Sequence, residues 1–350
     1  MALLVRGAVS EADWGVVCCG KGMTSPPLNT KGVRINMEKP VLIALSGPTA
    51  CGKTRLGVLL AQKFNGEVVS CDSMQIYRGM TIGTAAPTEE EMEGVPHHMV
   101  AVAEPGEQYS VARFVEEADA CVQDILSRGK LPILVGGTGL YMDALIRGNR
   151  FAAGDFSGEI RKKLYERLEN EGIEPLYEEL RAVDRETAER LHLNDEKRIL
   201  RALEVYLETG KTMTQHNAET QEGEDKYRAV RIALAFHDRE DMKKLIDLRV
   251  GKMEEAGLLQ EVEALMAAGL PRSSTAWQAI GYKEFLRVYD GEATVAEALD
   301  EIRLRSRQYA KRQLTWLRKK EPHWILWGKE RDFAIALQKA TEILTAEGVV

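Results

Sequence analysis

The sequence predicts an α/β fold: a parallel sheet flanked by helices, interrupted by an inserted all-helical domain. Up to about residue 150, short apolar runs bounded by glycine alternate with amphipathic helical stretches. This alternation is typical of a parallel sheet covered on both faces. Between residues 155 and 217 the chain instead contains charged amphipathic stretches and no convincing strand. That change of character predicts the helical insertion.

The first part of the predicted core contains three strands and two helices. Residues 40–45, 67–71 and 131–135 are the short apolar runs, and each is predicted to be a strand. Helical spacing over residues 54–64 and 110–127 predicts the helices. In the second helix one side is apolar and consists of Val111, Phe114, Val115, Ala118, Val122 and Ile125.

The later elements complete the expected domain organisation. Charged helices are expected over 159–170, 176–182 and 196–208, and alternating apolar residues predict a strand over 227–236. The remainder is expected to be helical, over 239–255, 258–268 and 295–320. These assignments give a core from 38–150 and 226–350, and a helical insertion from 151–225.

The first 36 residues differ from the rest of the chain. They contain five glycines, the pair Pro26 and Pro27, and no apolar periodicity. We therefore expect residues 1–37 to be a disordered N-terminal extension. Met37 is an alternative start, and the mass of the native N-terminus distinguishes the two.

Composition excludes several classes of protein. The chain has 350 residues, 44% of them hydrophobic and 29% charged, which excludes global disorder. No stretch approaches the ~18–20 apolar residues of a membrane-spanning helix, so no membrane partner is expected. Five cysteines without a C-x-x-C spacing argue against a disulfide scaffold and a zinc module. A reduced, cytoplasmic protein is expected.

One loop carries a strong phosphate-binding signal. Residues 47–54 match the pattern G-x-x-x-x-G-K-S/T and lie between a predicted strand and a predicted helix. The glycines let backbone N–H groups point at phosphate oxygens, and the helix adds its dipole. Lys53 supplies a point charge, and the Thr54 hydroxyl is placed to ligate magnesium. The predicted polyphosphate-binding residues are Gly47, Pro48, Thr49, Ala50, Cys51, Gly52, Lys53 and Thr54.

The residues alone leave the chemistry open. The second strand ends at Asp72, at the sheet edge where α/β folds bind ligands. The third strand ends in Gly136-Gly137-Thr138, with no acidic residue to serve as a Walker B magnesium ligand. A small-molecule kinase and another phosphate-ester transferase are favoured about equally on this basis. A nucleotide-dependent switch is the third reading.

Taken in order, the motifs resemble the tRNA dimethylallyltransferase family, bacterial type. The matching segments are 47–54, 72–80, 82–85, 95–98, 109–112, 135–141, 194–195, 198–205, 279–284 and 310–316. The resemblance implies a P-loop NTPase-like core. It implies magnesium-assisted transfer of a dimethylallyl group from dimethylallyl diphosphate to N6 of adenosine 37, beside the tRNA anticodon. An adenylate isopentenyltransferase acting on free AMP, ADP or ATP is the alternative, followed by a small-molecule kinase.

The resemblance also implies roles for residues. Asp72 would accept the proton of the amine, Thr138 would orient that amine, and Arg249 would neutralise charge on the departing diphosphate. Contacts to tRNA are implied for Asp72, Ser73, Met74, Gln75, Thr138, Arg161, Lys197, Arg198, Ile199, Leu200, Arg201, Gln278, Ala279, Ile280, Gly281, Tyr282 and Lys283. The implied partners are the tRNA anticodon stem-loop and dimethylallyl diphosphate. No obligate protein partner is expected, so the protein is expected to be a monomer.

The distribution of charge supports an RNA partner independently. The net charge of −7 by itself argues against nucleic acid. Residues 303–320, however, contain eight Lys or Arg and no acidic residue. On a helix, Arg305, Tyr309, Arg312 and Trp316 share one face, and basic residues interleaved with aromatics suit phosphates and unstacked bases. The opposite, core-facing side is predicted to contain Ile302, Ala310, Leu314 and Leu317.

Overall fold

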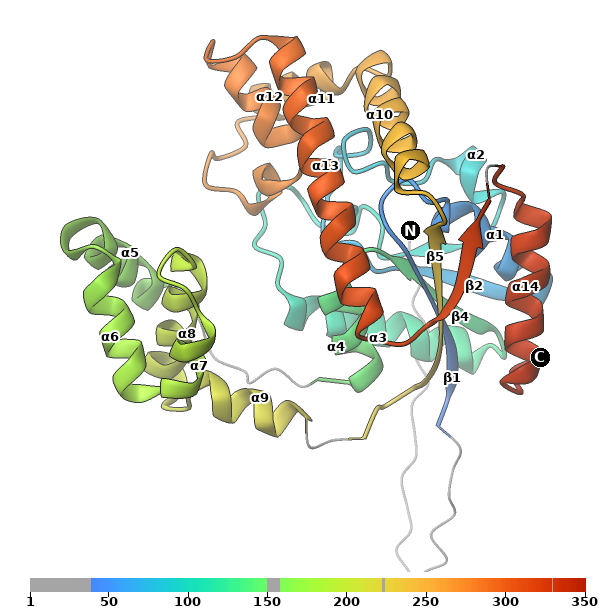
Figure 1. The fold of residues 1–350 in the computed structure, drawn as a ribbon, viewed down its shortest axis with the longest axis horizontal. Helices are drawn as coiled ribbons and strands as arrows, with labels where there is room; N and C mark the ends of the chain where they lie inside the picture. The colour runs from blue at the N-terminus through green and yellow to red at the C-terminus, as the bar shows by residue number, and fades with distance from the viewer. Residues whose placement is uncertain (1–38, 150–157, 222–223, 329) are drawn as a thin grey trace, which may run out of the picture. The chain divides into compact units, whose positions relative to one another are not determined.

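Six parallel strands form one sheet in the computed structural model, which describes residues 39–149, 158–221, 224–328 and 330–350 (Figure 1). The strands are β1 (Val41–Ser46), β2 (Gly66–Ser70), β3 (His97–His98), β4 (Leu131–Gly136), β5 (Arg228–Phe236) and β6 (His323–Trp327). Their order across the sheet is β3-β2-β4-β1-β5-β6. The expected disordered extension, residues 1–37, lies outside the described residues.

Strand β1 lies at the centre of the sheet, between β4 and β5. Ile43 is paired with Ile133 on one side and Val230 on the other. Alternate side chains of β1 belong to different hydrophobic clusters, with Leu42 in one and Ile43 in the other. Because both faces of the sheet are covered, the strand sequence is apolar throughout and does not alternate with polar residues.

Helices on the two faces supply these clusters. The cluster containing Leu42 is formed with α3 (Val111–Ser127) and α4 (Gly139–Arg147), and the one containing Ile43 with α1 (Lys53–Phe64) and α14 (Phe333–Ala346). The further helices of the core are α2 (Glu89–Met92), α10 (Arg239–Glu255), α11 (Leu258–Ala267), the 3-10 helix η1 (Thr275–Gln278), α12 (Tyr282–Tyr289) and α13 (Val295–Arg318). Thr294 and Glu297 form a capping box at the start of α13, which accounts for the sharp beginning of this 24-residue helix.

The expected insertion consists of five helices within its described part. They are α5 (Glu159–Glu171), α6 (Ile173–Val183), α7 (Arg185–Arg190), α8 (Glu196–Thr209) and α9 (Met213–Gln221). They share a hydrophobic cluster of their own, built around Leu164, Leu176, Leu180 and Leu203. Asp184 begins α7 by accepting a hydrogen bond from the Thr187 amide. Each charged helix therefore has an apolar stripe that its neighbours bury.

The predicted α/β class and the four predicted strands are confirmed, but one expectation is wrong. Residues after 236 are not all helical, because His323–Trp327 forms β6 and pairs with β5. Only Ile325 and Trp327 of this five-residue strand are buried. Two buried positions after Pro322 are too few for a clear period-two signal. Within the described part of the chain no helix has the length and apolar character needed to cross a membrane.

Candidate active site

The phosphate-binding loop connects β1 to α1, where the sequence predicts it. Gly52, the residue before α1, has φ 88°, a left-handed conformation that favours glycine. The Lys53 ammonium donates to the carbonyls of Gly47 and Pro48 at 3.0 and 2.9 Å, so its charge lies against the loop. From β6, the Trp327 indole donates to the Cys51 carbonyl at 2.9 Å and supports the loop.

Cys51 contributes packing and backbone to this loop. Its side chain is fully buried, and burial raises the pKa of its thiol. A thiol held in the neutral form is a poor nucleophile. The described cysteines, Cys51, Cys71 and Cys121, are all free thiols.

The ends of β2 and β4 bring Asp72 and Thr138 together. Thr138 Oγ1 accepts a hydrogen bond from the Ser73 amide at 3.1 Å, and the Thr138 amide donates to the Cys71 carbonyl at 3.1 Å. Asp72 Oδ1 accepts from the Met74 amide at 2.9 Å. Both Asp72 and Thr138 are half-buried. The structure therefore unites two of the three predicted catalytic residues at the carboxyl edge of the sheet.

Helix α13 forms another wall of this site through Gln313. The Gln313 carboxamide accepts from the Thr49 amide at 2.9 Å and donates to the Gly137 carbonyl at 3.1 Å. The approach is so close that a Cβ atom at Gly137 would lie 2.0 Å from Gln313 Nε2. A side chain at position 137 would therefore displace the Gln313 carboxamide and disturb its bond to the Gly137 carbonyl.

Gln313 is a site residue that the sequence motifs did not indicate. Gln313 lies three residues after Ala310 and four before Leu317, on the face of α13 that is otherwise apolar. It is 5% exposed. A polar side chain on a buried helix face needs hydrogen-bond partners, so this break in the apolar stripe was the available signal.

The predicted catalytic residue Arg249 reaches the same loop from α10. Its guanidinium donates to Thr49 Oγ1 at 3.1 Å and to the Thr84 carbonyl at 3.5 Å. Burial lowers the pKa of Arg249, and the nearby carboxylate of Asp72 opposes that shift. The guanidinium of an arginine stays charged in proteins at neutral pH. Arg249 and Lys53 therefore both place positive charge at the phosphate loop.

Tyr309 is a further neighbour of Asp72 that the sequence analysis placed only on the RNA-facing side of its helix. Its hydroxyl lies 3.4 Å from the Gly137 carbonyl. Burial and the charge of Asp72 raise the pKa of Tyr309 to about 12. The phenol is therefore protonated at neutral pH and acts as a hydrogen-bond donor.

The oxygen donors of the site suit magnesium. Thr54 is half-buried in the first turn of α1, and Asp72 follows the carboxyl end of β2. Within the described ranges no group of three or more His, Cys, Asp or Glu side chains is placed to hold a metal ion. Magnesium commonly binds through one or two protein oxygens together with phosphate oxygens and water. The residues present fit that mode of binding.

The basic face of α13 is only partly free to meet RNA. Four of the eight cations in residues 303–320, which run two residues past the end of α13, form ion pairs: Arg303 with Asp300, Arg305 with Glu301, Arg307 with Asp247, and Lys320 with Asp143. The groove beside them has a volume of about 520 Å³ and is lined by Gln308, Lys311, Arg312, Thr315, Trp316 and Lys319. Lys311 and Lys319 form no ion pair within the described part of the chain. Trp316 donates to Asp143 at 3.2 Å, so its ring is held at the edge of this groove.

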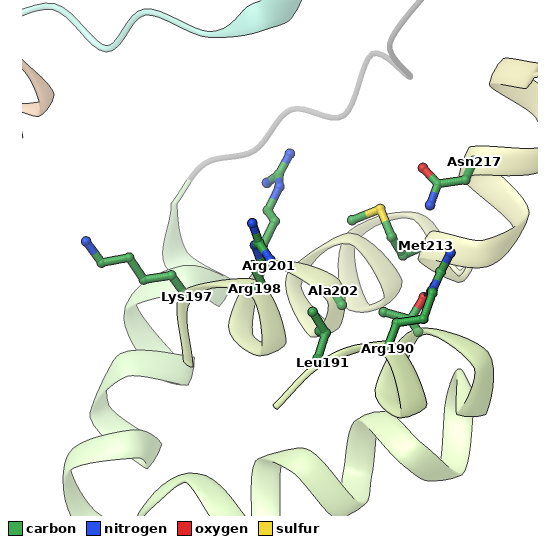
Figure 2. Close-up of a pocket in the computed structure, with 9 residues that line it drawn as sticks. Arg190, Leu191, Lys197, Arg198, Arg201, Ala202, Met213 and Asn217 are labelled. Carbon is green, nitrogen blue, oxygen red and sulfur yellow. Dashed lines mark hydrogen bonds between the residues drawn. The ribbon is translucent and has the colours of Figure 1, made fainter. Parts of the chain in front are cut away.

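A second basic groove lies in the insertion and contains several of the predicted tRNA contacts. Figure 2 shows Lys197, Arg198 and Arg201 on α8 and Arg190 on α7 around it. Its volume is about 390 Å³, and its lining consists of Thr187, Arg190, Leu191, Lys197, Arg198, Arg201, Ala202, Met213 and Asn217. The sequence analysis missed the contributions of α7 and α9.

Four residues of the insertion that were predicted to contact tRNA have contacts within the protein instead. Ile199 and Leu200 are buried in the insertion cluster, so their side chains are unable to contact RNA. Arg161 and Arg201 both form ion pairs with Glu204, at 2.9 and 2.7 Å, and Glu204 is 2% exposed. These two arginines therefore neutralise a buried carboxylate.

The predicted contact segment 278–283 is also only partly accessible. Gln278 and Lys283 are exposed and Ile280 is half-buried, whereas Ala279, Gly281 and Tyr282 are buried. The Tyr282 hydroxyl donates to Glu261, so its side chain has an internal role. Side-chain contact with RNA therefore stays a prediction for the accessible residues Gln278, Ile280 and Lys283.

Comparisons with known proteins show the family of this chain. The family model described as IPP transferase matches residues 75–320, and that described as Isopentenyl transferase matches residues 40–101. A tRNA dimethylallyltransferase of Caldanaerobacter subterraneus subsp. tengcongensis is 44% identical over 278 residues, which cover 79% of this chain and 88% of that protein. One of Geobacillus thermodenitrificans is 43% identical over 302 residues, covering 85% and 94%.

Solved structures show the same likeness. A tRNA isopentenylpyrophosphate transferase from Staphylococcus epidermidis is 40% identical, with a TM-score of 0.64 over 88% of this chain and 100% of that one. A eukaryotic dimethylallyltransferase acting on tRNA is 32% identical, with a TM-score of 0.69 over 82% and 74%. By the extent of the family match and the identity to its members, this chain belongs to the IPP transferase family.

Proposed function

We propose that this protein transfers a dimethylallyl group from dimethylallyl diphosphate to N6 of adenosine 37, beside the anticodon of tRNA. One observation carries the proposal. Hydrogen bonds join the parts of the site at one edge of the sheet. Gln313 connects Thr49 of the phosphate loop to Gly137, and Arg249 donates to Thr49. Thr138, next to Gly137, accepts from Ser73, the neighbour of Asp72. A diphosphate in the loop would thus lie beside a carboxylate.

The phosphate loop and its two cations act on the leaving group. Backbone N–H groups of the loop and the first turn of α1 bind diphosphate oxygens. Lys53 and Arg249 stabilise the negative charge that develops as the allylic C–O bond breaks. Thr54 would hold magnesium, which when bound adds to this charge neutralisation.

Asp72 and Thr138 act on the acceptor. The exocyclic amine of adenine is a weak nucleophile, because its lone pair is delocalised into the ring. As the new C–N bond forms, the amine proton passes to the Asp72 carboxylate and diphosphate leaves with the electron pair of the broken C–O bond. Thr138, held by the Ser73 amide, orients the amine toward the allylic carbon.

The acceptor base must leave the anticodon-loop stack to reach this carbon. Basic residues support RNA binding at two places, with Lys311 on α13 and Lys319 directly after it, and with Lys197 and Arg198 on α8. Positive side chains there would contact phosphates of the stem and loop. We further propose that the protein works as a cytoplasmic monomer.

Two alternatives are less well supported. A kinase that transfers a γ-phosphate would gain from an acidic residue at the end of β4, where this chain has Gly136. A prenyltransferase acting on free adenine nucleotides would need neither basic groove. The relatives named above are tRNA dimethylallyltransferases.

A single labelling assay tests the proposal. Purified protein with magnesium is given radiolabelled dimethylallyl diphosphate and unmodified tRNA, and parallel reactions contain AMP or γ-labelled ATP. We expect the label in tRNA, within the anticodon-loop fragment. Label on AMP alone, or phosphate transferred from ATP, would overturn the proposed function.

A further inference from the structure

Glu261 on α11 fills an anion-binding site made by backbone amides. Its carboxylate accepts from the N–H groups of Thr81 and Ile82 at 2.9 Å and of Gly83 at 3.2 Å. It also accepts from the Thr81 hydroxyl at 3.0 Å and from the Tyr282 hydroxyl. Successive N–H groups that converge in this way form a concave site for an anion, here occupied by an internal carboxylate.

The residues that follow in this loop contact the candidate active site. The Thr84 carbonyl accepts from Arg249 at 3.5 Å and from the Gln75 carboxamide at 3.3 Å. The Ala85 carbonyl accepts from the same Gln75 nitrogen at 3.0 Å. Gln75 in turn accepts from the Ser70 hydroxyl at the end of β2 at 3.0 Å. Residues 81–85 therefore contact Glu261 on one side and Arg249 and Gln75 on the other.

We propose that Glu261 is a positioning residue for Arg249. By holding the amides of residues 81–83, Glu261 keeps the Thr84 carbonyl where it accepts from the Arg249 guanidinium. That contact, with the bond to Thr49 Oγ1, directs the guanidinium at the phosphate loop. The inference rests on the proposed function for the role of Arg249 as a diphosphate ligand.

The bonds to Glu261 are suited to this task. Hydrogen bonds from amides to a carboxylate are stronger than neutral ones, and several that share one acceptor restrain the loop at consecutive residues. Without the carboxylate these amides would lose their acceptor together, and a surface loop without such bonds opens readily. Of the two hydrogen bonds that Arg249 forms in the described part of the chain, the one to Thr49 would then remain.

The test compares Glu261→Ala and Glu261→Gln with Glu263→Gln, an exposed glutamate on the same helix. The first readout is amide hydrogen exchange of residues 81–83. The second is the dissociation constant of inorganic pyrophosphate with magnesium, measured by calorimetry. For Glu261→Ala we expect the exchange rate of residues 81–83 to rise about 10-fold and the affinity for pyrophosphate to fall about 10-fold. Each change corresponds to the loss of about one hydrogen bond to a charged group. The KM for tRNA and all properties of Glu263→Gln should remain at wild-type values.

A double-mutant cycle separates positioning from a merely structural role. If Glu261 acts through Arg249, Glu261→Ala should cost no further pyrophosphate affinity in an Arg249→Ala background. Additive losses, or wild-type affinity in Glu261→Ala despite faster exchange, would overturn the inference. Should Glu261→Ala fail to fold, Glu261→Gln and Thr81→Ala carry the same comparison. A wild-type protein that binds no pyrophosphate would instead defeat the proposed function.

Discussion

Gln313 accepts a hydrogen bond from the backbone amide of Thr49 at 2.9 Å, although the two residues are 264 positions apart in the chain. The same carboxamide donates to the Gly137 carbonyl at the end of β4. One side chain of α13 thus connects the phosphate loop to the strand end that carries Thr138. This connection orients the amide face of the loop relative to the groups expected to act on the acceptor.

Replacing Gln313 by leucine should therefore impair the reaction more than the fold. We expect kcat/KM for dimethylallyl transfer to fall about 10- to 100-fold, or roughly 1.4–2.7 kcal/mol of transition-state stabilisation. Gln313→Glu keeps the acceptor for Thr49 but places a carboxylate oxygen against the Gly137 carbonyl, so it should also lose activity. Ser306→Ala, on the same helix, is the control, and an equal loss in that variant would refute the role of Gln313.

Asp72→Asn should slow catalysis strongly while sparing the local structure. Asparagine retains a carbonyl oxygen for the Met74 amide, which Asp72 binds at 2.9 Å, but it is no base. Single-turnover rates of transfer should fall about 10²- to 10⁴-fold, the usual range for loss of a general base. The affinity for tRNA, measured by filter binding, should remain. Turnover near the wild-type rate would exclude Asp72 as the proton acceptor.

Lys53→Ala should raise the KM for dimethylallyl diphosphate and lower kcat together. Its ammonium lies against the loop carbonyls of Gly47 and Pro48 and would contact the diphosphate both before and during bond breaking. Initial rates over a range of donor concentrations at saturating tRNA measure both constants. A raised KM with unchanged kcat would instead show that Lys53 binds the ground state and the transition state equally, and would contradict this expectation.

Glu67 should make the stability of the core dependent on acid. It is 2% exposed, and Arg128 foremost, then Lys130 and His98, hold its pKa well below the usual range. Because the folded-state pKa is depressed, the stabilisation is complete above the unfolded value of about 4.3 and is lost as pH falls below it. Urea unfolding between pH 7 and pH 3 should show a smaller decrease for Glu67→Gln than for the wild type.

At pH 7, Glu67→Gln should already be less stable by about 1–3 kcal/mol, because its charged partners lose a buried carboxylate acceptor. Glu116→Gln, an exposed residue of α3, serves as the control. If the free energy of unfolding decreased equally between pH 7 and pH 3 in the wild type and in Glu67→Gln, Glu67 would not supply the acid dependence.

Arg161 and Arg198 should separate stability from RNA binding. Arg161→Ala removes one partner of the buried Glu204 and should lower the unfolding midpoint of the insertion. The Arg198 side chain is 75% exposed, so Arg198→Ala should leave the midpoint unchanged. Its expected effect is weaker tRNA binding. The slope of log K for tRNA against log salt concentration should decrease in magnitude by about 0.7, the value for one lost phosphate contact to a single strand. Equal effects of the two substitutions on both readouts would contradict this division.

Local patterns in the sequence were sufficient for the fold class and the centre of the site. The phosphate loop is one continuous segment whose glycines and lysine act through their own backbone and side chains, and Asp72 and Thr138 directly follow their strands. In a parallel sheet, strand ends share an edge, so the meeting of Asp72 with Thr138 follows from the strand assignment. The short edge strand β6 was missed because its two buried residues carry too little periodicity.

The availability of the basic side chains is an example of what local sequence patterns leave undetermined. The sequence determined that residues 303–320 are basic although the whole chain is acidic, because side-chain charge is a property of composition. Only the tertiary structure decided which cations remain available, since Asp247 and Asp143 come from α10 and α4 and neutralise Arg307 and Lys320. The same holds for Gln313 and Glu261, whose partners are loops far away in the chain. Hydrogen bonds and ion pairs of this kind depend on how helices pack, and packing is a three-dimensional property that no single segment encodes.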